Sequence, residues 1–424
     1  MVVKRAADNT YAQFEYRYTA VVRINKATRT LDTVKLDVKR AGYTFLDLKP
    51  NSDVMNGLDI SPKAKFTYNA IRTDGKLLYP ADSGSSKPGS SYVGGLKPAT
   101  DYYVTITVTD DPNYEDASSE KGYTVRTLDA PTESWLNHTE SLDTSSSVVY
   151  ISTPGQLAML AKEINSGNLD GKGLTFVLTN DIDLTGYRWE PIGHEENAYD
   201  AYYFKGIFDG AGHTIRGLYV KNQVDYEQYQ GLFALLHDAT VRNLIIEESY
   251  IGGNGGEVGC IAGNVIGATL IENCITNITI DCSNSVNGGI VGYLDSSTAI
   301  IKNCVNYGNI AGYGYVGGIA GSIWAGTVIN CANYGKISGQ LDVGGIAGRL
   351  SNGTVINSVN FGDVESVYIG GTPKNTGGIV GENERKGAYV YNCYTTGTVK
   401  GSGTYVGAVV GRNTGDDGKV NQCY

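Results

Sequence analysis

"VGGIAGSIWAGTVINCANYGKISGQLDVGGIAGRL" spans Val316 to Leu350, and the phrase VGGIAG opens it and nearly closes it. Related phrases recur through the C-terminal half of the chain, in the order QGLFAL, VGCIAG, NGGIVG, TGGIVG and VGAVVG. The first glycines of the seven copies are Gly231, Gly259, Gly288, Gly317, Gly344, Gly377 and Gly407, so successive copies lie 28, 29, 29, 27, 33 and 30 residues apart. A period of about 30 residues predicts a repeat architecture.

Each copy contains three short strand-like stretches, which in one copy are Val316–Ile323, Thr327–Cys331 and Asn333–Ile337. They are rich in Val, Ile, Ala and Thr and are bounded by Gly or Asn, which is typical of strands and too broken for helices. Three strands per repeat, at a fixed period, predict a parallel β-solenoid whose coils stack at about 4.8 Å.

Single positions also recur once per coil. An Asn precedes a Cys or Ser at 273–274, 303–304, 330–331, 357–358 and 392–393, and Gln422-Cys423 continues the series. We expect the amides to form ladders and the thiols to pack as small apolar groups. A metal site is the alternative, but cysteines this far apart lack the C-x₂-C pairing of zinc sites.

Two further columns lie beside these pairs. Tyr307, Tyr334 and Phe361 are expected to stack along one edge. The glycines that follow them, Gly308, Gly335, Gly362 and Gly397, are expected to turn a corner with positive φ.

Composition excludes several partners. The chain has 424 residues and a formal net charge of -10, which argues against nucleic acid and anionic membrane surfaces. No apolar run reaches the roughly 18 residues of a membrane span. The first residues, MVVKRAADNTYAQ, lack a signal-peptide stretch, so the chain is either cytosolic or processed. Because it stops at VNQCY, inside a coil, either the natural protein continues past Tyr424 or another chain covers this end, and we expect the former.

An open solenoid end exposes unpaired strand edges and needs a cap. In ISTPGQLAMLAKEINSG, Thr153 and Gln156 form a capping-box pattern and Pro154 suits the first helical position. The residues Leu157, Leu160, Ala161 and Ile164 fall on one helical face. We therefore predict a capping helix over residues 153–166, with Gly167 as its stop.

The strings GIFDGAGHTIRGLYV (206–220) and GLFALLHDATVRNLIIE (231–247), with the serial GGI[AV]G phrases, resemble the GLUG-repeat proteins of bacterial cell surfaces. The resemblance covers residues 148–424 and implies a right-handed parallel β-helix in an exported, extracellular protein. Members of the family occur beside adhesin modules and beside protease domains, so the resemblance does not name one activity.

The N-terminal third has a different pattern. YVGGLKPATDYYVTITVTDD (92–111) and GYTVRTLDAP (122–131) resemble the last strands of a fibronectin type III domain, with Tyr103 at that family's corner tyrosine. The predicted fold class is therefore all-β: an immunoglobulin-like or fibronectin type III-like β-sandwich in residues 1–130, a polar linker in 131–147, and the β-helix in 148–424. Residues 1–32 belong either to the sandwich or to an upstream domain.

Candidate binding residues are tyrosines. Tyr199, Tyr202, Tyr203, Tyr226 and Tyr229 cluster in insertions around the first coils, and tyrosine with Asn and Gly suits recognition surfaces and stacking on sugar rings. The alternative is that tyrosine is simply a good strand residue on a half-wet face.

The chain offers few metal or catalytic motifs. Asp110, Asp111 and Asp116 share one loop and could hold calcium, although without EF-hand spacing, and no other cofactor is expected. His194 is followed by Glu195, which suggests either a solvated acidic loop or a cation site. No H-E-x-x-H motif is present, and acidic residues do not align in the repeats.

The sequence therefore favours a non-enzymatic, adhesin-like surface protein that binds a glycan or an extracellular protein, or that acts as a spacer. One alternative is a β-helix polysaccharide lyase or glycoside hydrolase, which needs two or more carboxylates on one face. The other is a non-catalytic accessory region of a larger surface protease.

Overall fold

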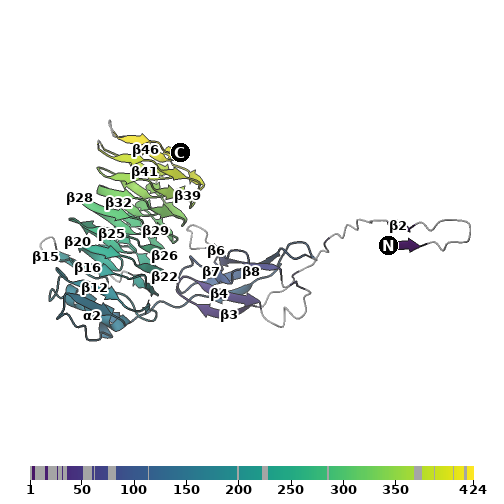
Figure 1. The fold of residues 1–424 in the computed structure, drawn as a ribbon, viewed down its shortest axis with the longest axis horizontal. Helices are drawn as coiled ribbons and strands as arrows, with labels where there is room; N and C mark the ends of the chain where they lie inside the picture. Colours follow the sequence, from purple (N-terminus) through teal and green to yellow (C-terminus); the bar gives the residue numbers. More distant parts are fainter. Residues whose placement is uncertain are drawn as a thin grey trace, which may run out of the picture.

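The structure is a computed structural model (Figure 1). It describes residues 2–4, 15–17, 26, 31, 36–50, 60–61, 63–74, 83–112, 114–197, 200–221, 228–283, 286–366, 375–385, 387–403, 405–414 and 418–424. Of the N-terminal 32 residues it describes little beyond an antiparallel pair, β1 (Val2–Lys4) and β2 (Glu15–Arg17), so the prediction for this segment falls mostly outside the described residues.

Two antiparallel sheets follow β2. One has the order β3-β4-β7, with β3 Leu36–Ala41, β4 Leu46–Pro50 and β7 Tyr92–Val93. The other has the order β10-β8-β5-β6 with β9 beside β8: β5 Lys65–Arg72, β6 Ser83–Ser85, β8 Asp101–Thr109, β9 Ala117–Ser118 and β10 Tyr123–Arg126. Buried residues of both sheets, including Leu46, Leu48, Tyr68 and Val104, form one core.

The alternation of β8 decides which tyrosine faces that core. Tyr102, Val104, Ile106 and Val108 are buried, whereas Tyr103 is 40% exposed. The Tyr102 hydroxyl accepts a hydrogen bond from the backbone N–H of Lys97 at 2.8 Å, which is the bond a corner tyrosine makes. The prediction of Tyr103 is wrong by one residue, because a period of two sends adjacent side chains to opposite faces.

The segment predicted as a linker packs against the solenoid. Its 3-10 turn η2 (Trp135–Asn137) buries Trp135, whose indole N–H donates to the carbonyl of Leu184 at 2.8 Å. Trp135 belongs to the solenoid core, so at least this part of the segment is fixed in place.

From β11 onward the chain forms a parallel β-solenoid of stacked coils (Figure 1). Among the described residues, three long sheets run along its axis, with 15, 13 and 7 strands. The 15-stranded sheet contains β11 Val148–Ile151, β12 Thr175–Leu178, β16 Ile207–Asp209, β20 Phe233–His237, β21 Thr240–Arg242, β24 Ala262–Ile266, β25 Leu270–Glu272, β28 Val291–Lys302, β32 Ala320–Ile329, β36 Ala347–Leu350, β37 Thr354–Ile356, β41 Val380–Asn383, β42 Tyr389–Tyr391, β46 Val410–Asn413 and β47 Lys419–Asn421.

The 13-stranded sheet contains β13 Ile182–Asp183, β17 Thr214–Arg216, β18 Tyr219–Lys221, β22 Ile245–Gly253, β26 Ile275–Cys282, β29 Val305–Asn306, β30 Asn309–Gly312, β33 Ala332–Asn333, β34 Ile337–Gly339, β38 Val359–Asn360, β39 Val364–Ser366, β43 Tyr394–Thr395 and β44 Val399–Gly401. The 7-stranded sheet contains β19 Tyr229–Gln230, β23 Glu257–Gly259, β27 Val286–Gly288, β31 Tyr315–Gly317, β35 Asp342–Gly344, β40 Asn375–Gly377 and β45 Tyr405–Gly407.

The predicted register is confirmed. Gly288 pairs with Gly317, Gly317 with Gly344, and Gly344 with Gly377, so each repeat stacks on the same position of the next. The strand bounds differ from the prediction, because β32 runs without a break through Ala320–Ile329.

Two asparagine ladders run along the solenoid, one predicted and one not. The outer ladder joins exposed amides, for example Asn303 Nδ2 to Asn273 Oδ1 at 3.1 Å. The inner ladder joins buried amides: Asn306 donates to Asn333 and Asn333 to Asn360, each at 2.8 Å. The sequence interpretation overlooked the inner ladder, although the recurring N-[YF]-G triplet signals it.

The glycine that ends each triplet has a different role from the predicted one. It is Asn303, Asn330 and the other outer-ladder residues that have positive φ, and Gly335 and Gly362 are not among the positive-φ glycines. A Cβ on Gly335 would lie 1.8 Å from the carbonyl oxygen of Gly308, so these positions need glycine because adjacent coils approach closely there.

The other two predicted columns are confirmed. The thiols of Cys274, Cys304 and Cys331 are buried and free. Tyr307, Tyr334 and Phe361 stack at centroid distances of 4.9 and 4.6 Å.

One α-helix, α2 (Pro154–Asn165), lies at the base of the solenoid (Figure 1). The backbone N–H of Gln156 donates to the Thr153 hydroxyl at 3.2 Å, and the Gln156 side chain accepts from the backbone N–H of Ser152 at 2.8 Å. The predicted apolar face is fully buried in the solenoid core. Gly167 follows the helix with a φ of 72°.

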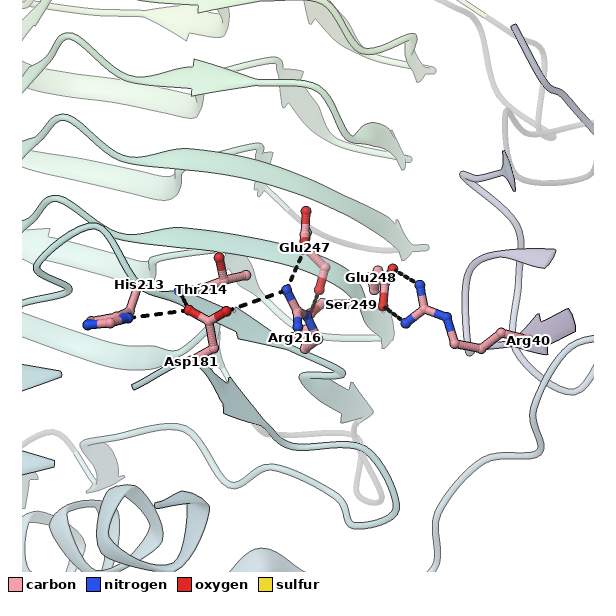
Figure 2. A network of polar contacts seen from close by, with 8 residues as sticks. All are labelled: Arg40, Asp181, His213, Thr214, Arg216, Glu247, Glu248 and Ser249. Carbon is pink, nitrogen blue, oxygen red and sulfur yellow. Dashed lines mark hydrogen bonds and ion pairs between the residues drawn. The ribbon is translucent and has the colours of Figure 1, made fainter. Parts of the chain in front are cut away.

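The N-terminal sheets contact the side of the solenoid through a bulge in β22. The register shifts between Glu247 and Ser249, and Glu248 takes a φ of 53°. Figure 2 shows its carboxylate accepting two hydrogen bonds from Arg40, at 3.0 and 2.7 Å. The bulge therefore turns one side chain of the solenoid outward, toward the N-terminal sheets.

Two further contacts support this interface. Lys97 and Asp281 form a 2.8 Å ion pair with side chains only 14% and 18% exposed. Tyr43 packs on Tyr219 at 5.0 Å, and its hydroxyl accepts from the backbone N–H of Gly186 at 2.8 Å. The contact is thus partly buried and geometrically specific.

Candidate functional site

The candidate site is a pocket of about 370 Å³ at the base of the solenoid. It lies where the end of α2 meets the segment before β14 (His194–Asn197) and the strand β19. The lining residues are Leu136, Asn165, Glu190, Pro191, Gly193, His194, Glu195, Gln228, Tyr229 and Ala234. An open pocket with apolar walls and a few polar groups is the usual form of a small-ligand site.

Asn165, the last residue of α2, holds one wall. Its Nδ2 donates to the carbonyl of Pro191 at 3.0 Å, and its Oδ1 accepts from the backbone N–H of Gly193 at 2.6 Å. Gly193 has a φ of 87°, and a Cβ there would lie 2.6 Å from the carbonyl oxygen of Tyr202. The helix end thereby fixes the turn that places His194 and Glu195 at the pocket.

The three predicted tyrosines that the structure describes gather around this turn. Tyr202 stacks on His194 with a centroid distance of 4.7 Å, and Tyr203 meets His237 edge-on at 5.4 Å. The Tyr229 hydroxyl is hydrogen-bonded to Glu195. Tyr199 and Tyr226 lie outside the described residues.

Burial and nearby carboxylates raise the pKa values of two tyrosines around the pocket. Burial, the Glu195 hydrogen bond and the charge of Glu257 raise the pKa of Tyr229 well above its usual range. Burial raises the pKa of Tyr203 as well, with Glu195 adding to the effect. Both phenols therefore stay protonated at neutral pH and remain hydrogen-bond donors.

Glu257 lies one coil above Tyr229, with which it pairs in the sheet. Burial raises its pKa to about 7, and the charges of Asp295 and Glu195 add to this, although a hydrogen bond from Asn264 opposes it. That bond runs from Asn264 Nδ2 to Glu257 Oε2 at 2.7 Å. A carboxyl that takes up its proton near neutral pH is a marker of functional sites.

Sequence reasoning missed Asn165, Gln228, Glu190 and Glu257. The first three lie in segments with no repeated motif, so only the fold brings them together. Glu257 had a weak signal, because it fills the position before VGCIAG at which other copies have Val286, Tyr315 or Asp342.

The three predicted calcium ligands do not converge. Asp110 forms a 2.8 Å ion pair with Lys65, Asp111 is buried and accepts from the backbone N–H of Ser61, and Asp116 is exposed. No group of three His, Cys, Asp or Glu among the described residues is arranged to hold a metal ion. Calcium binding thus stays a prediction.

A second polar network lies on the 13-stranded sheet (Figure 2). Asp181 accepts from the backbone N–H of Thr214 at 3.0 Å and lies 3.4 Å from His213. Arg216 bonds Glu247 in the next coil at 3.1 Å. The backbone hydrogen bond from Thr214 is the main cause of the lowered pKa of Asp181. These contacts join successive coils of the solenoid.

The chain matches no protein-family model. It is 37% identical over 123 residues to a protein of Evansella cellulosilytica provisionally designated a Gly-rich membrane protein. The match covers 27% of this chain and only 13% of that relative's length. Within the described part of the chain, no helix has the length and apolar character needed to cross a membrane.

Among solved structures, the chain is similar to a Bacteroides ovatus protein provisionally designated an immunoglobulin A1 protease. The TM-score is 0.50 and the identity 22%, over 66% of this chain and 85% of the other. A second similar structure is an IgA1 protease, with a TM-score of 0.47 and 15% identity, covering 83% of this chain and 28% of that protein. At 22% identity the likeness to the Bacteroides ovatus protein concerns the fold alone, an all-β chain with a parallel β-solenoid.

Proposed function

We propose that this chain is a non-enzymatic, adhesin-like protein of the bacterial cell surface that binds carbohydrate in the pocket beside Tyr229. The observation that carries the proposal is the lining of the pocket: an aromatic ring, two amides and two carboxylates around a cavity of about 370 Å³. Aromatic faces suit the C–H faces of sugar rings, and amides and carboxylates suit hydroxyl groups.

The surrounding architecture supports a surface role. We take residues 1–130 as a fibronectin type III-like sandwich, residues 131–147 as its connection, and residues 148–424 as a right-handed helix of GLUG-type repeats capped by α2. The corner hydrogen bond of Tyr102 supports the first assignment, and the burial of the apolar face of α2 supports the cap. Both resemblances support the proposed extracellular location.

The test is a glycan array that also assays polysaccharides for cleavage, run on the whole chain. We expect binding without turnover, and loss of binding in Tyr229→Ala. Tyr229→Phe keeps the ring and removes the hydrogen bond to Glu195, so it separates stacking from polar contact. Tyr150→Ala is the matched control, because Tyr150 is 63% exposed on β11 and does not line the pocket. Failure of every glycan to bind would overturn the proposal.

A carbohydrate-active enzyme is the second candidate, and Glu257 is the observation that favours it. Its pKa of about 7 suits a general acid, and Glu195 and Asp295 lie near enough to influence it. Turnover abolished by Glu257→Gln, with binding retained, would establish this candidate in place of the first.

The third candidate is a non-catalytic accessory region of a larger surface protease. The provisional designation of the Bacteroides ovatus protein points to it, and the docked N-terminal sheets suit a rigid spacer. A protease domain in the same natural polypeptide, together with a failure to bind glycans, would favour it.

A further inference from the structure

The described side chains that line the pocket carry a net negative charge. Its lining contains the carboxylates of Glu190 and Glu195 and the imidazole of His194 and, among the described lining residues, neither Lys nor Arg. Glu190 is balanced by an ion pair with Arg188. Glu195 has no such partner in the described part of the chain, since its described contact is with the neutral hydroxyl of Tyr229.

The next coils extend the same sign of charge. Glu257 lies above Tyr229, and Asp295 follows in the strand β28. Asn264, which donates a hydrogen bond to Glu257, carries no charge. Burial is the main cause of the raised pKa of Glu257, and the charges of Asp295 and Glu195 add to it.

Two described basic groups near this end are paired elsewhere, and the exposed Lys162 and Lys172 do not line the pocket. Lys205 pairs with Asp170 at 3.5 Å. His237 lies 3.0 Å from Asp238. Farther along the solenoid, Arg349 is bound by both Glu384 and the hydroxyl of Tyr315. None of these paired groups is free to balance a negative ligand at Glu195.

We propose that this pocket accepts sugars without negative charge, neutral or amine-bearing, and rejects uronic and sialic acids. The inference rests on the proposed carbohydrate function and adds its selectivity. The physical reason is twofold. An anionic sugar would lose hydration on entering a partly enclosed site. It would also come close to the carboxylate of Glu195, and like charges brought together at an interface strongly disfavour binding. A neutral hydroxyl instead donates a hydrogen bond to Glu195, and a protonated amine adds an ion pair.

The experiment compares charge classes on one glycan array at pH 7, followed by calorimetric titration of the strongest binder in each class. Methyl-esterified and free-acid oligogalacturonates serve as a matched pair, because they share a backbone and differ in charge. We expect neutral or amino sugars to bind at least tenfold more tightly than acidic ones. Glu195→Gln should shrink that ratio at least threefold, and Glu195→Lys should reverse it. Glu365→Gln is the control, because Glu365 pairs with Lys336 on a different sheet.

The outcomes separate the two proposals. Acidic sugars binding as tightly as neutral ones would overturn the charge selectivity and leave carbohydrate binding intact. A selectivity unchanged in both Glu195 variants would remove it from this pocket. If no sugar of any class binds, both proposals fail.

Discussion

Replacing Glu257 by Gln should remove a pH dependence from the stability of the solenoid. The folded-state pKa is about 7, against an ordinary value of 4.5, because partial burial and the charges of Asp295 and Glu195 disfavour the charged carboxylate. Between these two values the folded state holds a proton that the unfolded state has lost. The free energy of unfolding therefore falls as pH rises from about 4.5 to about 7 and levels off above that.

The magnitude follows from the two pKa values. They differ by about 2.5, and each pKa unit corresponds to about 1.4 kcal/mol, so the loss approaches about 3 kcal/mol in wild type. Gln has the shape of the protonated acid and keeps the acceptor for Asn264. The variant should match wild type near pH 4.5 and be more stable than wild type at pH 8.

The assay is urea unfolding of wild type, Glu257→Gln and the control Glu365→Gln at half-unit steps from pH 4.5 to 8. Asp295→Asn should produce a partial effect, because it removes one of the charges that raise the Glu257 pKa. A pH dependence in Glu257→Gln as steep as in wild type would refute the reasoning, since the proton would then be bound elsewhere.

Three other changes test the fold. Asn333→Ala should destabilise the solenoid by about 3 kcal/mol, because it leaves several buried partners of the inner ladder unpaired. Asn330→Ala in the exposed outer ladder should destabilise it less. Thermal unfolding of both variants measures the difference. Gly335→Ala should prevent a stable solenoid, because its methyl group would overlap the carbonyl of Gly308 in the preceding coil. A circular dichroism spectrum and a melting curve like those of wild type would contradict this close approach. Arg40→Ala should loosen the N-terminal sheets from the solenoid and increase the radius of gyration measured by small-angle scattering. The exposed control Arg126→Ala should leave the radius of gyration unchanged. An unchanged radius in Arg40→Ala would mean that the other contacts hold the interface without Arg40.

Repeat spacing was predictable because each coil repeats one local pattern, and a stacked residue meets its own counterpart. The stacking of Tyr307 on Tyr334 and the burial of Cys304 needed no information beyond the period of the sequence. The role of Gly335 was not predictable in the same way. Its φ is unremarkable along the chain, and only the carbonyl of a neighbouring coil excludes a side chain.

The helix α2 was predicted closely, because a capping residue, a proline and an apolar stripe act within twelve residues. The corner tyrosine was misplaced by one position, because two adjacent tyrosines fit the same pattern until packing chooses one of them.

For the candidate site, the sequence alone showed that tyrosines and acidic residues are concentrated near the first coils, but it did not show how they are arranged in space. Asn165, Glu195, Tyr229 and Glu257 come from four separate segments, and the coil rise brings the last two together as sheet neighbours. Their charges and pKa values depend on burial and on distances across coils, which only the tertiary structure decided. In a solenoid, residues about 30 positions apart in the sequence contact each other in adjacent coils, so the stacked ladders can be predicted from the repeat period. The insertions that interrupt this period have no such counterpart, and their neighbours are decided only by the folded structure.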